Sequence, residues 1–368
     1  MSKPKLAGLT LIVCLGVAPG LAPADQGPPV MDAVRIATGQ NSTIGLIAGG
    51  VGSTDTRIAA DIAQALDDGD KLRILPMLGN GSAQNIADLI FLKGVDVAIV
   101  HTDVLTQTMQ SGTIPREGSV QYIAKLFPEE IHILARNEIA SLKDLNGKPV
   151  ATGMLGSGTE LTAAALLDMC HITPNIVHEG QTAALDHLRR GEIAAMVVVG
   201  GEPVPMLQGI DAGSGLHFVP IPLNAQLIDS YVPTGLDHHS YPDLVPAGRP
   251  VETVAVGSVL VTLSTPSDTA RAKRVNRFVD ALFERFDQFR RPGFHPKWRE
   301  VNLSAQVQGW TRYPEALSLA RGPSDTNLRT SFDSYLNQSG QSASGIDSER
   351  RESLFRDFLK WREQHSGP

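Results

Sequence analysis

The first third of the chain repeats one pattern, in which an apolar strand-like run gives way to a small polar turn and then to a helix-like run. The clearest run, Val95 to Val100, is almost continuously apolar, as in strands that are buried on both faces of a parallel sheet. The turns Gly49 to Gly52 and Gly79 to Ser82 each precede apolar residues at helical spacing. This alternation predicts an α/β fold, with a ligand crevice at the carboxyl ends of the strands.

The strands at the two ends of this region are less regular. We expect the first strand at Val34 to Thr38, followed by a polar turn that ends at Asn41. Two further strands are predicted at Ile123 to Leu126 and Ile131 to Ala135. Pro128 is expected to separate them, because proline has no N–H group to donate to a strand ladder.

A second α/β lobe is predicted for residues 133–221, where the alternation of strand and helix resumes. Ala194 to Val199 is its most apolar strand candidate. The long apolar run Val254 to Thr262 then returns the chain to the first lobe. An amphipathic helix is expected after it, at Ser267 to Phe289, and the aromatic segment His295 to Arg321 is expected to be packed.

The turn at Gly153 to Glu160 lies between a strand candidate and an alanine- and leucine-rich helix candidate, Leu161 to Leu167. A helix N-terminus attracts anions, because its unpaired N–H groups and its dipole favour negative charge. Two interpretations stay open: a cradle for a ligand carboxylate, or a helix cap that serves only the fold. The candidate binding residues of this turn are Gly156, Ser157, Gly158 and Thr159.

The N-terminus has the three parts of an export signal within residues 1–24. Lys3 and Lys5 precede the apolar run Leu6 to Val17, and small residues follow at Ala22 to Ala24. The apolar run is too short to cross a bilayer. We therefore expect a signal peptide at 1–24 and a periplasmic mature protein with no stable membrane insertion.

Charge and residue chemistry disfavour several classes of function. The net charge of −7 and the isoelectric point near 5.8 argue against nucleic acid as a partner. The one tight group of metal-ligating residue types, Asp237 to His239, contains adjacent histidines, which point in different directions on a regular element. We therefore predict no metal and no cofactor. A periplasmic enzyme that uses His239 or Glu202 is the alternative class of function. The sequence offers no nucleophilic residue with a second residue positioned to act as its base, so we predict no catalytic residue.

Several motifs together match one family in their order and spacing. They are Thr38-Gly39, Gly79-Asn80-Gly81-Ser82 with Asn85, Gly94 to Val100 with Asp103, Leu126 to Glu130 before Ile131-His132-Ile133, Leu142 to Lys148, Gly156 to Thr159, and Gly200-Gly201-Glu202-Pro203. From Val34 to Thr262 the chain resembles the solute-binding proteins of TRAP transporters of the TAXI type.

The resemblance implies an α/β fold of the periplasmic binding protein-like type II, with two lobes around a ligand cleft. It implies capture of a small organic anion, a carboxylate or an amino acid such as glutamate, and delivery to the subunits of a TRAP-type membrane permease. We expect residues 25–130 and 230–292 in lobe 1, residues 131–229 in lobe 2, and a C-terminal helical extension at 293–368. The alternative is a periplasmic ligand sensor with the same fold that signals through a partner, with the amphipathic segment Asp347 to Gln364 as its contact.

The ligand-binding residues are expected at the turns of both lobes. Asp103 can accept a hydrogen bond from a ligand amine or cap the next helix, and both roles stay open. After Gly39 the sequence departs from the family pattern: Asn41 to Ile44 and a glycine-rich loop stand where aromatic residues usually wall the ligand. The remaining expected ligand-binding residues are Thr38, Gly39, Asn41, Asn80, Gly81, Ser82, Gly201 and Glu202.

Overall fold

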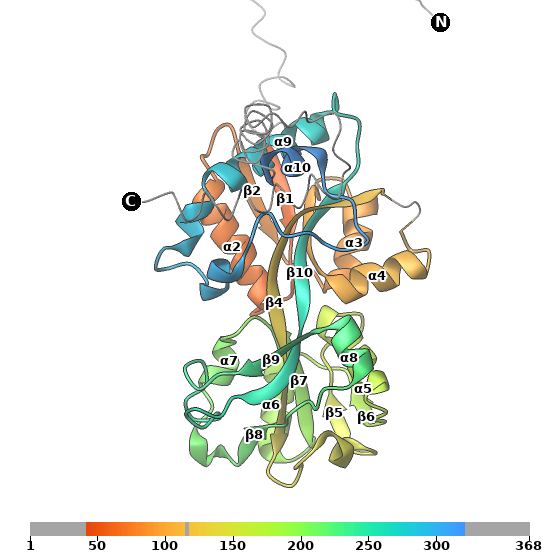
Figure 1. The fold of residues 1–368 in the computed structure, drawn as a ribbon, viewed down its shortest axis with the longest axis vertical. Coiled ribbons are helices and arrows are strands. Elements are labelled where there is room, and N and C mark those ends of the chain that lie inside the picture. Colours follow the sequence, from red (N-terminus) through yellow and green to blue (C-terminus); the bar gives the residue numbers. More distant parts are fainter. Residues whose placement is uncertain (1–41, 115–117, 321–368) are drawn as a thin grey trace, which may run out of the picture. The chain divides into compact units, whose positions relative to one another are not determined.

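A computed structural model describes residues 42–114 and 118–320 (Figure 1). The elements up to the first long strand are β1 (Thr43–Ile47), α2 (Thr54–Leu66), β2 (Arg73–Met77), α3 (Ser82–Phe91), β3 (Val97–His101), α4 (Thr102–Gln110) and β4 (Val120–Arg136). Those that follow are η1 (Leu142–Leu145), β5 (Pro149–Ala151), α5 (Gly158–Met169), β6 (Asn175–Val177), α6 (Gln181–Arg190), β7 (Ala195–Gly200), α7 (Pro205–Gln208), η2 (Ala212–Ser214) and β8 (Leu216–Phe218). The last are α8 (Ala225–Ser230), β9 (Val232–Leu236), β10 (Val251–Leu263), α9 (Ala270–Glu284), η3 (Phe286–Arg290), η4 (Pro296–Glu300) and α10 (Pro314–Ala320).

The strands form one continuous sheet in the order β2-β1-β3-β10-β4-β7-β5-β6, with β8 added to β4 and β9 added to β10. In the first lobe β1 pairs in parallel with both β2 and β3. In the second lobe β5 pairs in parallel with both β6 and β7. The pairs that β4 and β10 make are antiparallel. The predicted α/β class with two lobes of parallel strands is thus confirmed.

Strands β4 and β10 run from one lobe to the other as an antiparallel pair (Figure 1). β4 is 17 residues long and continuous, so the predicted break at Pro128 is wrong. Pro128 lies opposite Gly257, next to an irregularity in the register between Gly257 and Val259. Proline is tolerated inside a sheet at such irregularities, because no regular ladder hydrogen bond is required of it there.

Each lobe buries apolar side chains on both faces of its part of the sheet. In β3, Val97 and Ile99 pack with α2 and α9, whereas Ala98 and Val100 pack with α3 and α4 on the other face. This two-sided burial explains the nearly continuous apolar run that predicts β3. Residues Leu236, Tyr241 and Val245 were expected in lobe 1, but they pack in a core of lobe 2.

Residues 293–320 contribute to the core of lobe 1 and do not form a separate extension there. Trp298 is fully buried and stacks on Phe289 with ring centroids 4.2 Å apart. Its indole N–H donates a hydrogen bond to Asp61 Oδ2 at 2.9 Å. A buried indole generally needs such a partner, so the aromatic segment is packed, as predicted.

Some predictions lie outside the described residues. These are the signal peptide at 1–24, the strand at Val34 to Thr38, the site residues Thr38, Gly39 and Asn41, and the tail segment Asp347 to Gln364. The first strand that the structure describes is β1, which the sequence reading did not predict. Among the described residues, none of the helices has the length and apolar character that crossing a membrane requires.

His132 is a fully buried imidazole in the lobe 2 part of β4. Tyr241 Oη lies 2.8 Å from its Nε2 and itself accepts a hydrogen bond from the Val204 N–H group. The Tyr241 proton therefore points to Nε2, and Nδ1–H faces the Val198 carbonyl at 3.3 Å. Burial lowers the pKa of His132 to about 4, because the charged form loses its hydration.

Acid should destabilise the protein through His132. The unfolded chain takes up a proton near pH 6.5, but the folded chain does so only near pH 4, so the stabilisation is complete above pH 6.5 and is lost as the pH falls. The loss amounts to roughly 3 kcal/mol over this interval. Urea unfolding from pH 7 to pH 4.5 should show a steeper decline for the wild type than for His132→Asn.

The matched control is His171→Asn, because His171 is exposed and adopts a positive φ that asparagine tolerates. This variant should keep the pH dependence of the wild type. Parallel pH profiles for the wild type and His132→Asn would contradict the assignment.

Candidate functional site

A cavity of about 600 Å³ is lined by residues of both lobes. Lobe 1 supplies Gly49 to Ser53, Asp55, Asn80 to Ser82, His101 and Glu129. Lobe 2 supplies Gly153, Met154, Ser157 to Thr159, Gly180 to Ala183, Val199 and Met206. The cavity thus lies at the carboxyl ends of the parallel strands, where the alternating pattern predicted a ligand crevice.

The N-terminal ends of four helices border this cavity. The N-cap residues are Ser53 for α2, Gly81 for α3, Ser157 for α5 and Gly180 for α6, and all of them line it. The first N–H groups of a helix have no partner within the helix, and the helix dipole makes that end positive. The glycine N-caps Gly81 and Gly180 have no side chain to bind these groups. Such an arrangement favours an anion in the cavity.

Buried polar side chains hold the lobe 1 turns in place. Asn85 Nδ2 donates to the carbonyls of Ala48 and Ile99, at 2.9 and 3.0 Å, and so ties α3 to the ends of β1 and β3. A side chain at Gly79 would collide with Asn85, since its Cβ would lie 2.0 Å from Asn85 Oδ1. Ser82 Oγ accepts a hydrogen bond from the His101 N–H group at 2.9 Å. The turn Gly79 to Ser82 is therefore held in place by the hydrogen bonds of Asn85 and Ser82 and by the close packing at Gly79.

The central turn of lobe 2 caps a helix and also lines the cavity. Ser157 Oγ accepts from the Glu160 N–H group at 3.1 Å, which makes Ser157 a helix cap. The same residue lines the cavity, together with Gly158 and Thr159. Gly158 packs against lobe 1, since a Cβ added to it would lie 3.0 Å from His101 Cε1 and 3.2 Å from Ser82 Oγ.

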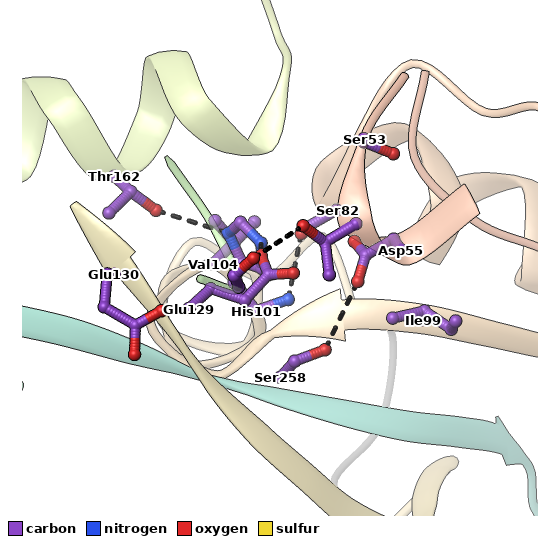
Figure 2. Close-up of polar contacts among 12 residues, drawn as sticks. Ser53, Asp55, Ser82, Ile99, His101, Val104, Glu129, Glu130, Thr162 and Ser258 are labelled. Atoms are coloured by element: carbon purple, nitrogen blue, oxygen red, sulfur yellow. Dashed lines mark hydrogen bonds and ion pairs between the residues drawn. The ribbon is translucent and has the colours of Figure 1, made fainter. Parts of the chain in front are cut away.

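Three buried titratable side chains meet at the cavity, each from a different element (Figure 2). Asp55 is in the first turn of α2, His101 ends β3, and Glu129 lies in β4. His101 Nε2 lies 2.7 Å from Glu129 Oε2. Burial, together with the charge of Glu129, raises the pKa of Asp55 well above its ordinary value.

His101 is the cation of this cluster. Burial alone would lower its pKa, but the hydrogen bond to Glu129 and the charges of Glu129, Asp55 and Asp103 outweigh it and raise the pKa to about 9. At neutral pH the imidazolium therefore neutralises one carboxylate, and the raised pKa of Asp55 favours its uncharged form.

Asp103 has partners other than those expected from the sequence. Its Oδ2 accepts from Thr162 Oγ1 of α5 at 2.8 Å and from the Tyr231 hydroxyl at 3.2 Å. Thr162 Oγ1 also lies 3.4 Å from His101 Nδ1. Asp103 is not among the residues that line the cavity, so the structure gives it a contact between the lobes in place of a contact to a ligand amine.

The other expected site residues divide into two groups. Asn80, Gly81, Ser82, Ser157, Gly158 and Thr159 line the cavity. Gly156, Gly201 and Glu202 do not: the Gly156 N–H group faces Glu160 Oε2, Gly201 packs against Thr54 and Lys297, and the Glu202 N–H group donates to Glu130 Oε2.

Sequence reasoning missed several residues that line the cavity, including Ser53, Asp55, His101 and Glu129. Two signals were present. Glu129 lies in a strand with many apolar residues, and an acid that is buried there must find a partner or a ligand. His101 follows a fully apolar strand at its carboxyl end, where binding residues are usually found.

The fold and the site place this chain in the periplasmic binding protein-like class, with two α/β lobes around one ligand cavity. A model of the NMT1-like family matches residues 46–312, and the chain belongs to this family.

The chain is also similar to solved structures at low identity. One is a TctC solute binding protein from Polaromonas, at 19% identity over 67% of this chain and 88% of that chain, with a TM-score of 0.39. Another is the periplasmic binding protein BugD, at 12% identity over 82% of this chain and 98% of that chain, with a TM-score of 0.43. A third is CbnR, a LysR family transcriptional regulator, at 12% identity over 68% of this chain and 73% of that chain, with a TM-score of 0.38.

Glu129→Gln should destabilise the protein by roughly 3 kcal/mol, because removal of one partner leaves the buried His101 charge without compensation. Urea unfolding at pH 7 measures this change. The control is Glu138→Gln, since Glu138 pairs with Arg136 at the surface, where such pairs contribute less than about 1 kcal/mol. Equal stability of the two variants would show that the pair with His101 contributes little.

Proposed function

We propose that this chain is an exported, periplasmic solute-binding protein that captures a small organic anion, a carboxylate or an amino acid such as glutamate. It delivers this solute to a TRAP-type membrane permease, as the resemblance to the TAXI type implies. The observation that carries the proposal is the convergence of four helix N-termini, two from each lobe, on one cavity. Capture proceeds without chemistry, so no residue is assigned a catalytic role.

A carboxylate that enters the cavity loses its water and must receive hydrogen bonds in return, because an unpaired buried charge costs several kcal/mol. The N–H groups at the start of α5 and α6 and the hydroxyl of Thr159 are the donors of lobe 2. Asn80, Ser82 and the N–H groups at the start of α2 and α3 are those of lobe 1. Each hydrogen bond to a charged group contributes roughly 1.5 to 3 kcal/mol.

Capture depends on donors from both lobes at once. A ligand that contacts both lobes only when they are close together favours that arrangement by its difference in affinity for the two states. The contact of Gly158 with His101 and Ser82 defines how closely the lobes approach each other at the cavity. This contact is therefore part of the proposed binding state.

The first test is to identify the solute. Small molecules released when the purified protein is denatured would be identified by mass spectrometry, and each candidate would then be titrated in a thermal-shift assay. At a hundredfold excess over its Kd a true ligand stabilises the folded state by about 2.7 kcal/mol. We expect a carboxylate or an amino acid to raise the Tm by several degrees. Failure of all organic acids to do so would reject the proposal.

Gly158→Ala tests the contact between the lobes. The added methyl group suits a helix, but it would lie about 3 Å from the His101 ring in the closed arrangement. Overpacking of this kind costs roughly 1 to 3 kcal/mol, so we expect affinity for the solute to fall about tenfold or more while the Tm without solute stays near that of the wild type.

Gly209→Ala is the matched control, because Gly209 has an ordinary φ of −85° and no atom within 4 Å of an added Cβ. Its affinity should equal that of the wild type. Wild-type affinity in Gly158→Ala as well would show that solute binding does not require this approach of the lobes.

A further inference from the structure

The cluster of Asp55, His101 and Glu129 has the chemistry of a metal site. Each residue offers one ligand atom, and these atoms all lie within 4.8 Å of one another. The three side chains are buried, yet they line the cavity. They come from three different elements, so the fold alone brings them together (Figure 2).

An imidazole and two carboxylates form a donor set for a divalent transition-metal ion such as Zn²⁺. Ligand atoms in a tetrahedral zinc site are about 3.3 Å apart, given bonds of about 2.0 to 2.1 Å. The distance from His101 Nε2 to Glu129 Oε2, 2.7 Å, is shorter than this, and the upper limit of 4.8 Å for the cluster is longer. Small side-chain rotations therefore suffice to surround an ion.

A second observation supports the same interpretation. Metal-binding histidines usually use their other ring nitrogen to donate a hydrogen bond, which fixes the ring and its tautomer. His101 Nδ1 lies 3.4 Å from Thr162 Oγ1, which in turn donates to Asp103 Oδ2 at 2.8 Å. This chain of contacts leaves Nε2 directed at Glu129. The ring is thus oriented from the side opposite to the proposed ion.

We propose that Asp55, His101 and Glu129 bind a divalent transition-metal ion at the wall of the cavity, with a fourth position open to a carboxylate of the solute. Binding releases the Nε2 proton of His101 and the proton of Asp55 to water, and the two charges of the ion then neutralise the two carboxylates. Catalytic and ligand-exchanging zinc sites likewise have three protein ligands and one open position. The fourth ligand rests on the proposed function, whereas the three protein ligands do not.

The probe is Zn²⁺ alone, titrated by calorimetry into the mature chain after treatment with a chelator and dialysis. We expect one ion per chain. His101→Gln and Glu129→Gln should each weaken binding by more than about 100-fold, since loss of even an outer hydrogen bond to a ligand costs 10- to 100-fold. Asp55→Asn keeps the shape of the side chain and serves if the other variants do not fold; it should weaken binding at least about tenfold.

The control is His187→Asn in lobe 2. His187 also lies between two acids, with Nδ1 2.6 Å from Glu179 and Nε2 3.7 Å from Glu192, but it is partly exposed and is not among the residues that line the cavity. This variant should keep the zinc affinity of the wild type. No zinc binding to the wild type, or binding that survives the cluster variants and is lost in His187→Asn, would overturn the metal site.

Thermal-shift titrations of the identified acid, with zinc and with EDTA, separate the two proposals. An acid that binds more tightly with zinc supports the open fourth position. An acid that binds equally well in EDTA overturns that position and leaves the proposed function intact. Zinc binding without any effect of organic acids supports the three-residue site and rejects the proposed function.

Discussion

The antiparallel pairing of β4 and β10 is the constraint on which the rest of the structure depends. These two strands are the shared members of both lobes: β10 pairs with β3 in lobe 1, and β4 pairs with β7 in lobe 2. Since a strand alternates its side chains between two faces, adjacent acids on β4 reach different surroundings. Glu129 faces His101 at the cavity, whereas Glu130 pairs with the buried Lys297 at 2.6 Å. β4 therefore supplies one acid to the cavity and one acid that binds the segment around η4.

Much of the fold could be predicted from the sequence because its signals are local. A buried parallel strand such as β3 is almost continuously apolar, and the glycine-bearing turn at Gly79 to Ser82 indicates that a helix, α3, begins there. The prediction of the first strand was limited for a local reason too: β1 contains a glycine, which weakens a strand, so the run Val34 to Thr38 was the more obvious candidate. At Pro128 the expectation of a break failed, because two residues of β4, Leu126 and Phe127, lie opposite the single residue Ser258 of β10, and this irregularity accommodates the proline.

The candidate site could be predicted only in part, for a physical reason. Ser82, Ser157 and Thr159 lie in glycine-bearing turns before helices, and such turns are recognisable without knowledge of the rest of the chain. The roles of His101 and Glu129 depend on a contact across 28 positions in the sequence, which no local pattern encodes. For Asp103 the sequence left a ligand contact and a helix cap open, and in the structure Thr162 and Tyr231 donate hydrogen bonds to its carboxylate.

Contacts between the lobes reach the titratable cluster directly, so the two are coupled. Gly158 lies against the His101 ring, and Thr162, one turn further along α5, contacts the same ring and Asp103. Movement of α5 away from lobe 1 would therefore remove the partner of His101 Nδ1 and expose the ring to water. A ligand that binds the cluster more tightly when Thr162 holds the ring would favour the close approach of the lobes, and that approach would favour its binding equally, because such coupling is reciprocal by thermodynamic necessity. The same helix thus presents its N-terminus to the cavity and contacts the His101 ring of the cluster.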